Sequence, residues 1–417
     1  AIDKWTDTSS ININWNSVGE FLEQIDNLHL GVNFGTLLGY GTLRRGIIND
    51  EIRLLTFDER EKIKYLLQEG IRQGAFGLSL GLAYGHERAS TTEEIVEIAR
   101  GLNGTHAVIK IHLRWEGADL LSSVNEAIRI GRETGFPIQI SHLKAIGRKA
   151  WPSLKKVLEM IKAAQESGLD INFDISPYST TGSLLYLLIP SWARQGGFQD
   201  LFSRIDDPAQ YTQIIEDLRG MTLHYNRILI TSAKTKTIVG KTISQLAQYS
   251  GLDPAETLVK LVRANEGRVS MVGRTMLPKN IQRAMIDTYA FIASDGEGYG
   301  QEELKSGNLV HPRSFGAFPH FWHRLVNDLK VMKAEIAVQK ITLGPAKKMG
   351  ISERGVLQKG NFADIIIFDP NLIRDRATYL NPFRFPAGIE YVIVNGKMAV
   401  KQGMNLGVRA GMALRKK

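Results

Sequence analysis

The segment AVIKIHLRWEGADLLSSVNEAIRIGRETGFPIQISH, residues 107–142, decides the fold. Two runs of β-branched and apolar residues, 107–112 and 137–142, enclose the stretch 121–135. Apolar residues recur three and four positions apart in that stretch, which ends at a glycine, so it is predicted to be a helix between two strands. Strands joined through a helix are typical of a parallel α/β sheet.

The same alternation continues on both sides of this segment. Further strands are predicted at 32–39, 76–82, 169–178 and 289–295. Further helices are predicted at 59–74, 92–102 and 153–168, the second with an N-terminal cap formed by Thr91 or Thr92 together with Glu94. The fold class is therefore α/β, and the pattern supplies six of the eight strands of a (β/α)8 barrel.

The domain organisation follows from two breaks in this rhythm. Residues 1–345 are expected to form the barrel, with 180–284 as an inserted subdomain or lid, because prolines and the pair Gly196–Gly197 interrupt the alternation there. Residues 346–417 contain apolar runs joined by a turn at Asn395–Gly396, which predicts part of a small antiparallel β-sandwich.

Composition excludes several functional classes. The net charge is +9, but the basic residues are scattered and no aromatic basic groove accompanies them, so we expect no nucleic-acid partner. No apolar run approaches the ~20 residues of a membrane span, and residues 1–10 carry no signal pattern, so we expect a cytoplasmic protein without a membrane partner. The chain has no cysteine, so histidine, carboxylate or a modified side chain must hold any metal.

Three predicted strands end in side chains suited to metal-assisted hydrolysis: His112, His142 and Asp295. The carboxyl ends of barrel strands open onto one face, so these side chains should converge. Imidazole nitrogens are common zinc ligands, and a single histidine at a strand end is usually a packing residue. Two of them on adjacent strands, with an aspartate on the last strand, favour a metal site.

Seven blocks in order resemble one known family. They are GAFGLSLGLAY (74–84), HLRWEG (112–117), ISHLKAIG (140–147), SPYSTTGS (176–183), SDG (294–296), HPRSFGAFP (311–319) and RGVLQKGNFADIIIFDP (354–370). The chain resembles the N-acyl-D-amino-acid deacylases, or D-aminoacylases, of the amidohydrolase superfamily. The resemblance implies hydrolysis of a small-molecule N-acyl-D-amino acid.

The resemblance also implies roles for single residues. His112 and His142 would be zinc ligands, and Asp295 would be the general acid and base. Lys144, Tyr178 and Arg313 would hold the substrate carboxylate, since they offer a compact charge, a hydroxyl and a planar two-pronged donor.

The chain departs from the family pattern in three places. It contains neither the HxH pair of the first strand nor the cysteine loop after the second, and Tyr40 stands where the family has histidine before GTLR. Six strands leave a gap between the 289–295 and 32–39 strands. We expect a separate segment, such as an N-terminal fragment or a second chain, to supply two strands, further metal ligands and partner strands for the sandwich there.

Two alternatives to a zinc-dependent N-acyl-D-amino-acid deacylase stay open. One is a catalytically silent or incomplete barrel that binds a small carboxylate. The other is a cyclic-amide hydrolase related to hydantoinase or dihydroorotase, against which the HPR and SHLK blocks argue. Stoichiometric zinc would separate the enzyme from the silent binder.

Overall fold

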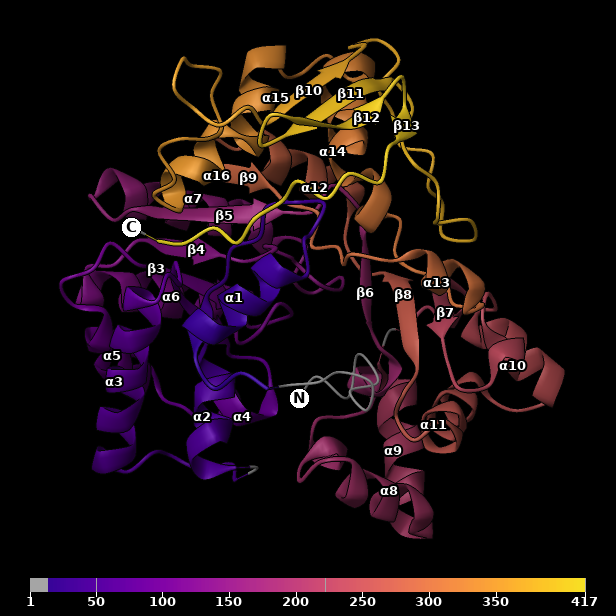
Figure 1. Ribbon diagram of the computed structural model, residues 1–417. Coiled ribbons are helices and arrows are strands. Elements are labelled where there is room, and N and C mark those ends of the chain that lie inside the picture. The colour runs from indigo at the N-terminus through magenta and orange to yellow at the C-terminus, as the bar shows by residue number, and fades with distance from the viewer. Residues whose placement is uncertain (1–13, 50, 222, 417) are drawn as a thin grey trace.

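A parallel sheet of six strands organises the structure, a computed structural model that describes residues 14–49, 51–221 and 223–416 (Figure 1). Residues 1–10, where the sequence shows no signal pattern, lie outside the described residues. The sheet has the order β1-β2-β3-β4-β5-β9, and every neighbouring pair is parallel. Its strands are β1 (Leu38–Gly39), β2 (Gly77–Gly81), β3 (Val108–His112), β4 (Ile138–Ile140), β5 (Ile171–Ile175) and β9 (Ala290–Ile292). The predicted α/β class and the six strands are confirmed.

The predicted helices lie between these strands. They are α3 (Phe57–Arg72), α5 (Thr92–Ala99), α6 (Leu120–Thr134) and α7 (Ser153–Glu166). Thr91 caps α5, because its hydroxyl accepts a hydrogen bond from the backbone N–H of Glu94 at 3.2 Å. The apolar faces of these helices and of the sheet form one core that includes Leu67, Ile111 and Ile140, all fully buried. Burial of that face, rather than helix propensity, holds such helices in place.

The first strand is shorter than predicted. Only Leu38–Gly39 pairs with β2, whereas the 32–39 run was expected to be a strand throughout. Phe34 instead bridges Ala413, and its backbone N–H donates to the carbonyl of Met412 at 2.9 Å. The carboxyl-terminal segment therefore forms backbone hydrogen bonds with this stretch that a neighbouring strand of the sheet would otherwise form.

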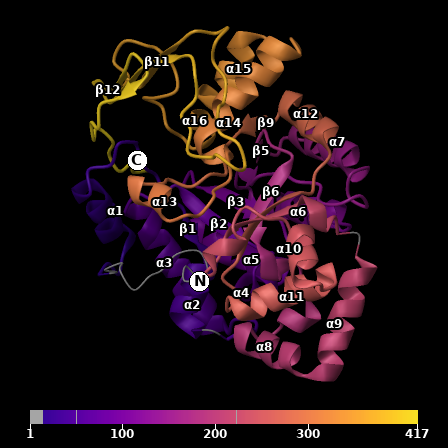
Figure 2. The same cartoon turned by 90° about the vertical axis from the view of Figure 1, so that its right-hand side faces the viewer.

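The two edges of the sheet are β1 and β9. No pairing joins them in the part of the chain that the structure describes, and in Figure 2 β9 lies above β1. The expectation that a separate segment fills the gap between them stays a prediction. Neither edge has a neighbouring strand among the described residues, although on the outer side of β9 the Lys340 ammonium donates to the carbonyl of Ala290 at 2.9 Å.

A second, antiparallel sheet lies between β5 and β9 in the chain. It has the order β6-β8-β7, from β6 (Thr180–Leu184), β7 (Ile228–Ser232) and β8 (Ser270–Arg274). Its helices are α8 (Phe198–Asp206), α9 (Pro208–Gly220), α10 (Ile243–Ser250) and α11 (Pro254–Ala264), at the lower right of Figure 1. This region has its own apolar cluster, whereas α12 (Pro278–Ile286) packs into the main core. The boundary at 180–284 stays a prediction.

The carboxyl-terminal strands form a third sheet at the top of Figure 1. They are β10 (Ile365–Phe368), β11 (Ile389–Val394), β12 (Lys397–Lys401) and β13 (Met404–Asn405), all antiparallel. The turn between β11 and β12 has positive φ at Asn395 and Gly396, 48° and 78°, as a two-residue hairpin requires. Before this sheet the chain forms two short helices, α15 (Ala334–Ile341) and α16 (Leu343–Lys348), which are separate because Thr342 leaves the helical region.

The remaining helices are α1 (Val18–Asn27), α2 (Tyr40–Ile48), α4 (Gly85–Arg88), α13 (Gln301–Lys305) and α14 (Arg313–Trp322). Among the described residues, no helix is both long enough and apolar enough to cross a membrane.

Tyr40 belongs to a buried polar network between α2 and α5. Its hydroxyl donates to Glu94 Oε1 at 2.7 Å, and Arg44 Nη1 contacts the same oxygen at 2.6 Å. Glu94 Oε2 accepts the backbone N–H of Leu55 at 2.8 Å. The Arg44 side chain is fully buried, so the pair is shielded from water. The hydrogen bonds of Tyr40 therefore fix α2 against α5.

Arg44→Met should destabilise the protein by about 3–5 kcal/mol, because it leaves the Glu94 carboxylate buried without its counter-ion. Urea unfolding followed by circular dichroism measures the loss. Arg53→Met is the matched control, because Arg53 makes comparable contacts with Glu51 and Glu59 at the surface and should lose far less. Equal losses in the two variants would contradict a role for burial.

Candidate active site

Two histidines meet at the carboxyl ends of adjacent strands. His112 is the last residue of β3, and His142 follows β4 by two residues. His112 Nδ1 lies 2.9 Å from His142 Nε2, and the rings are edge to face with centroids 4.5 Å apart. The parallel register of β3 and β4 brings these residues together, as the strand-end pattern predicted.

Glu116 joins this pair from the loop after β3. Its Oε1 atom lies 3.2 Å from His142 Nδ1 and 3.7 Å from Lys144 Nζ. Burial raises the pKa of the Glu116 carboxyl, but the charge of Lys144 and the contact with His142 outweigh burial and bring it to about 2. The side chain is therefore an anion placed against two imidazoles.

The donor set fits a divalent metal ion. Glu116 Oε1 and His142 Nδ1 are buried, and their 3.2 Å contact lacks hydrogen-bond geometry, so neither has a hydrogen-bond partner in the described chain. Unsatisfied buried polar atoms are rare and mark places that a ligand can satisfy. Ligand atoms of His112, Glu116 and His142 lie within 4.8 Å of one another. Burial lowers the pKa of His112 to about 4, so its ring is neutral and able to bind a metal.

A second group of charges continues from this cluster. Asp295, three residues beyond β9, places Oδ2 2.6 Å from Arg313 Nη1 and 3.9 Å from Lys144 Nζ. Arg313 is the first residue of α14. Contacts thus run without interruption from His112 through Glu116 and Lys144 to Asp295 and Arg313.

Two of these residues have strained backbones. His142 has φ of 36° and Asp295 has φ of 51°, in the left-handed region that residues with a Cβ atom seldom adopt. Such strain persists only where the surrounding structure imposes it, and it is concentrated at functional sites.

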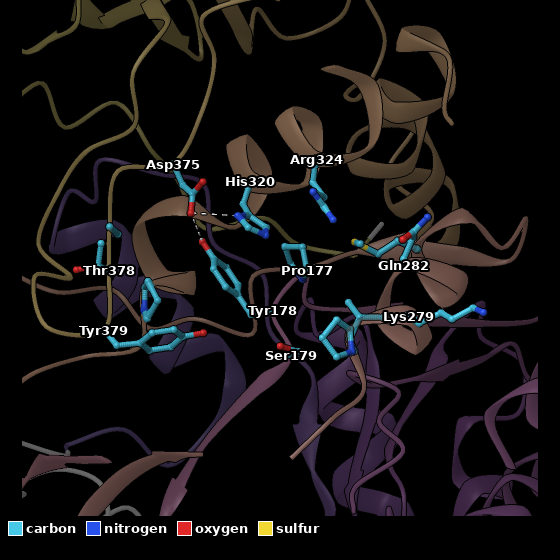
Figure 3. Close-up of a pocket in the computed structure, with 15 residues that line it drawn as sticks. Pro177, Tyr178, Ser179, Lys279, Gln282, His320, Arg324, Asp375, Thr378 and Tyr379 are labelled. Atoms are coloured by element: carbon cyan, nitrogen blue, oxygen red, sulfur yellow. Dashed lines mark hydrogen bonds and ion pairs between the residues drawn. The ribbon is translucent and has the colours of Figure 1, made fainter. Parts of the chain in front are cut away.

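Tyr178, the sixth predicted site residue, contacts Asp375 and His320 (Figure 3). Its hydroxyl donates to Asp375 Oδ2 at 3.0 Å, and its ring stacks on His320 with centroids 4.6 Å apart. These three residues line a cavity of about 520 Å³. The Tyr178 ring also packs edge to face on His311, whose Nδ1 accepts the backbone N–H of Arg313 at 3.1 Å.

Burial leaves the rings of His311 and Tyr178 uncharged. Burial, with the charge of Arg313, lowers the pKa of His311 to about 3, and burial with nearby Asp375 raises the pKa of Tyr178. A tyrosine hydroxyl has one proton, and here Asp375 accepts it.

Three residues of this site were not predicted from the sequence: Glu116, His311 and Asp375. Glu116 and His311 stand inside the HLRWEG and HPR blocks, so their only signal was position beside residues with assigned roles. Asp375 lies in none of the blocks, 197 residues after Tyr178 in the chain. Only the folded chain brings it to that hydroxyl.

Comparisons with known proteins agree with this fold. Residues 309–400 match the model of the Amidohydrolase family. The chain is 28% identical to a D-aminoacylase of Alcaligenes xylosoxydans xylosoxydans over 396 residues, which are 95% of this chain and 72% of the relative.

Two solved structures share the architecture. An N-acyl-D-glutamate deacylase from Bordetella bronchiseptica, complexed with zinc and a phosphonate mimic of the tetrahedral intermediate, superposes with a TM-score of 0.80 at 26% identity. A D-aminoacylase studied for its binuclear metal centre gives 0.78 at 28%. Each comparison covers 96% of this chain and 75% of the other, so the similarity runs through the whole chain.

Proposed function

Because this chain belongs to the D-aminoacylase, or N-acyl-D-amino-acid deacylase, family of amidohydrolases, we propose that it hydrolyses the amide bond of N-acyl-D-amino acids. The products are a D-amino acid and a carboxylate. The observation that carries the proposal is the unbroken line of contacts from His112, Glu116 and His142 through Lys144 to Asp295 and Arg313.

The metal side of this line consists of His112 and His142, which would hold zinc. Glu116 is the candidate third ligand, because its Oε1 atom is buried, anionic and without a hydrogen bond in the described chain. A zinc ion supplies Lewis-acid polarisation of a carbonyl and lowers the pKa of a water to about 7. Histidine and carboxylate are among the ligand types that zinc takes in catalytic sites.

Asp295 performs the proton transfers in this proposal. Its carboxylate accepts a proton from the attacking water and delivers that proton to the departing amine, so no net proton stays on the enzyme. Lys144 lies 3.9 Å from Asp295 Oδ2 and balances its negative charge. Asp295 has a positive φ, and its Oδ2 atom contacts both Lys144 and Arg313.

Arg313 binds the substrate carboxylate. This contact releases Asp295, the general base, from its ion pair with Arg313. Without substrate, Arg313 Nη1 donates to Asp295 Oδ2 at 2.6 Å. A substrate carboxylate can take both prongs of the guanidinium, which is the stronger contact. Asp295 then loses its closest cation, so its carboxylate accepts a proton more readily at the step that requires it. Tyr178 completes the carboxylate site if its hydroxyl exchanges Asp375 for the substrate.

Metal analysis together with deacylation assays tests the proposal. We expect stoichiometric zinc and release of D-amino acids from N-acetyl-D-amino acids, with the L-enantiomers inactive. A protein that binds these compounds but holds no metal would be the silent binder. Turnover of a hydantoin in place of the N-acyl compounds would favour the cyclic-amide hydrolase.

Arg313→Lys should raise the Michaelis constant for N-acetyl-D-amino acids about tenfold or more while zinc content stays unchanged, because one ammonium cannot reproduce a two-pronged contact. Steady-state kinetics at equal metal load measure the change. Arg283→Lys, at an exposed arginine of α12, is the control and should behave as wild type. An unchanged Michaelis constant would place the carboxylate elsewhere.

The edges of the parallel sheet support a further part of the proposal. In the described chain β1 and β9 each have one unpaired side, and the terminal sheet leaves Ile366 and Ile367 half exposed. We infer that an additional segment, an N-terminal fragment of the same gene product or a second chain, adds strands at these edges and further metal ligands.

Light scattering on this chain by itself should therefore show self-association, because the open edges pair with other copies. Adding the segment that completes the sheet should convert the sample to a defined species. A monodisperse single chain that holds zinc and turns over substrate would contradict this part of the proposal.

A further inference from the structure

A second cavity, of about 290 Å³, lies between the loop after β4 and the inserted sheet. Four side chains that line it are basic: Arg148, His224, Arg227 and Arg274. None of the described residues that line it is acidic. None of the site residues described above lines this cavity, so it is a separate site.

Two of its arginines come from neighbouring ends of adjacent chain segments in the inserted sheet. Ile228 of β7 pairs with Gly273 of β8; Arg227, the last residue of a 3-10 turn, directly precedes Ile228, and Arg274 ends β8. Like charges held close together on paired strands repel each other. All three arginines are exposed, and in the described chain no carboxylate forms an ion pair with them. An anion in the cavity would relieve this repulsion.

The walls of the cavity are fixed to each other by hydrogen bonds. The backbone N–H of Gly147 and the indole N–H of Trp151 both donate to the carbonyl of Thr275, at 2.9 Å and 3.0 Å. Asn280 Nδ2 donates to the carbonyl of Trp151 at 2.8 Å. The barrel loop and the end of β8 therefore form a preformed site, which lowers the entropy that binding must overcome.

The lining combines the three arginines with an apolar surface. Trp151, Leu188, Met271 and Leu277 supply apolar walls. Ligand sites are typically concave and mostly apolar, with a few placed polar groups, and this volume is near the lower limit of the roughly 300–1,000 Å³ that they occupy. A ligand that satisfies both parts has one anionic head and a small apolar body.

We propose that this cavity binds a small organic carboxylate with an apolar body, such as an arylacetate. The planar guanidinium groups of Arg227 and Arg274 receive the carboxylate, and the apolar body lies against Trp151 and Leu188. This inference does not depend on the proposed deacylase activity.

The probe is phenylacetate, titrated against the full chain in the Arg313→Gln background, which removes the proposed carboxylate contact at the catalytic group. Saturation-transfer NMR reads the ligand and works for assemblies of any size. We expect saturable binding of phenylacetate and none of the neutral phenylacetamide. Adding Arg227→Gln or Arg274→Gln should raise the dissociation constant about tenfold, since each removes a charge-assisted hydrogen bond.

Arg283→Gln, an exposed arginine away from the cavity, is the matched control and should leave the dissociation constant unchanged. Without ligand, Arg274→Gln should keep or raise the melting temperature, because it removes like-charge repulsion, whereas a purely structural arginine would lower it. Equal binding of the acid and the amide, or unchanged binding in both cavity variants, would overturn the proposal. Loss of deacylase activity in any variant leaves this test unaffected.

Discussion

Asp295→Asn should retain zinc and bind N-acyl-D-amino acids, yet its turnover should fall about 10²–10⁴-fold, the usual contribution of a general acid or base. An amide cannot accept the proton of the attacking water. Asparagine keeps the size of the side chain, so its oxygen can still accept from Arg313, which lies 2.6 Å from Oδ2 in the wild type. Binding and chemistry are therefore separated in this variant.

Single-turnover kinetics, with substrate affinity measured separately by calorimetry, check this result. Glu297→Gln makes the same carboxylate-to-amide change two residues away in the same loop, at an exposed side chain, and should retain wild-type turnover. If Asp295→Asn retained most of its activity, another base would have to act.

His142→Ala should lose stoichiometric metal and all measurable hydrolysis. The His142 ring contacts both His112 and Glu116, at 2.9 Å and 3.2 Å, so its removal takes away the central member of the candidate ligand group. The inserted sheet should remain folded, because its apolar cluster contains none of these residues.

Elemental analysis measures the metal, and circular dichroism checks the fold. His106→Ala removes an exposed histidine outside the site and should change neither. A His142→Ala protein with normal zinc would show that the metal lies elsewhere.

Much of the secondary structure could be predicted from short stretches of the sequence. The cap at Thr91 and the turn at Asn395–Gly396 depend on residues within a few positions of each other, so the chain encodes them directly. The three strands of the inserted sheet were not predicted. Their pairings, such as Thr180 with Arg274, join residues almost a hundred positions apart, so no local pattern marks them.

The sequence by itself determined that His112, His142 and Asp295 share one face, because the carboxyl ends of parallel strands always do. Only the tertiary structure decided which loop residues join them. Glu116 turns back onto His142, Asp375 reaches Tyr178 from the far end of the chain, and Arg227 and Arg274 come to line one cavity. Strand periodicity repeats every two residues and can be read along the chain, whereas loop paths and antiparallel registers are set by packing between distant segments.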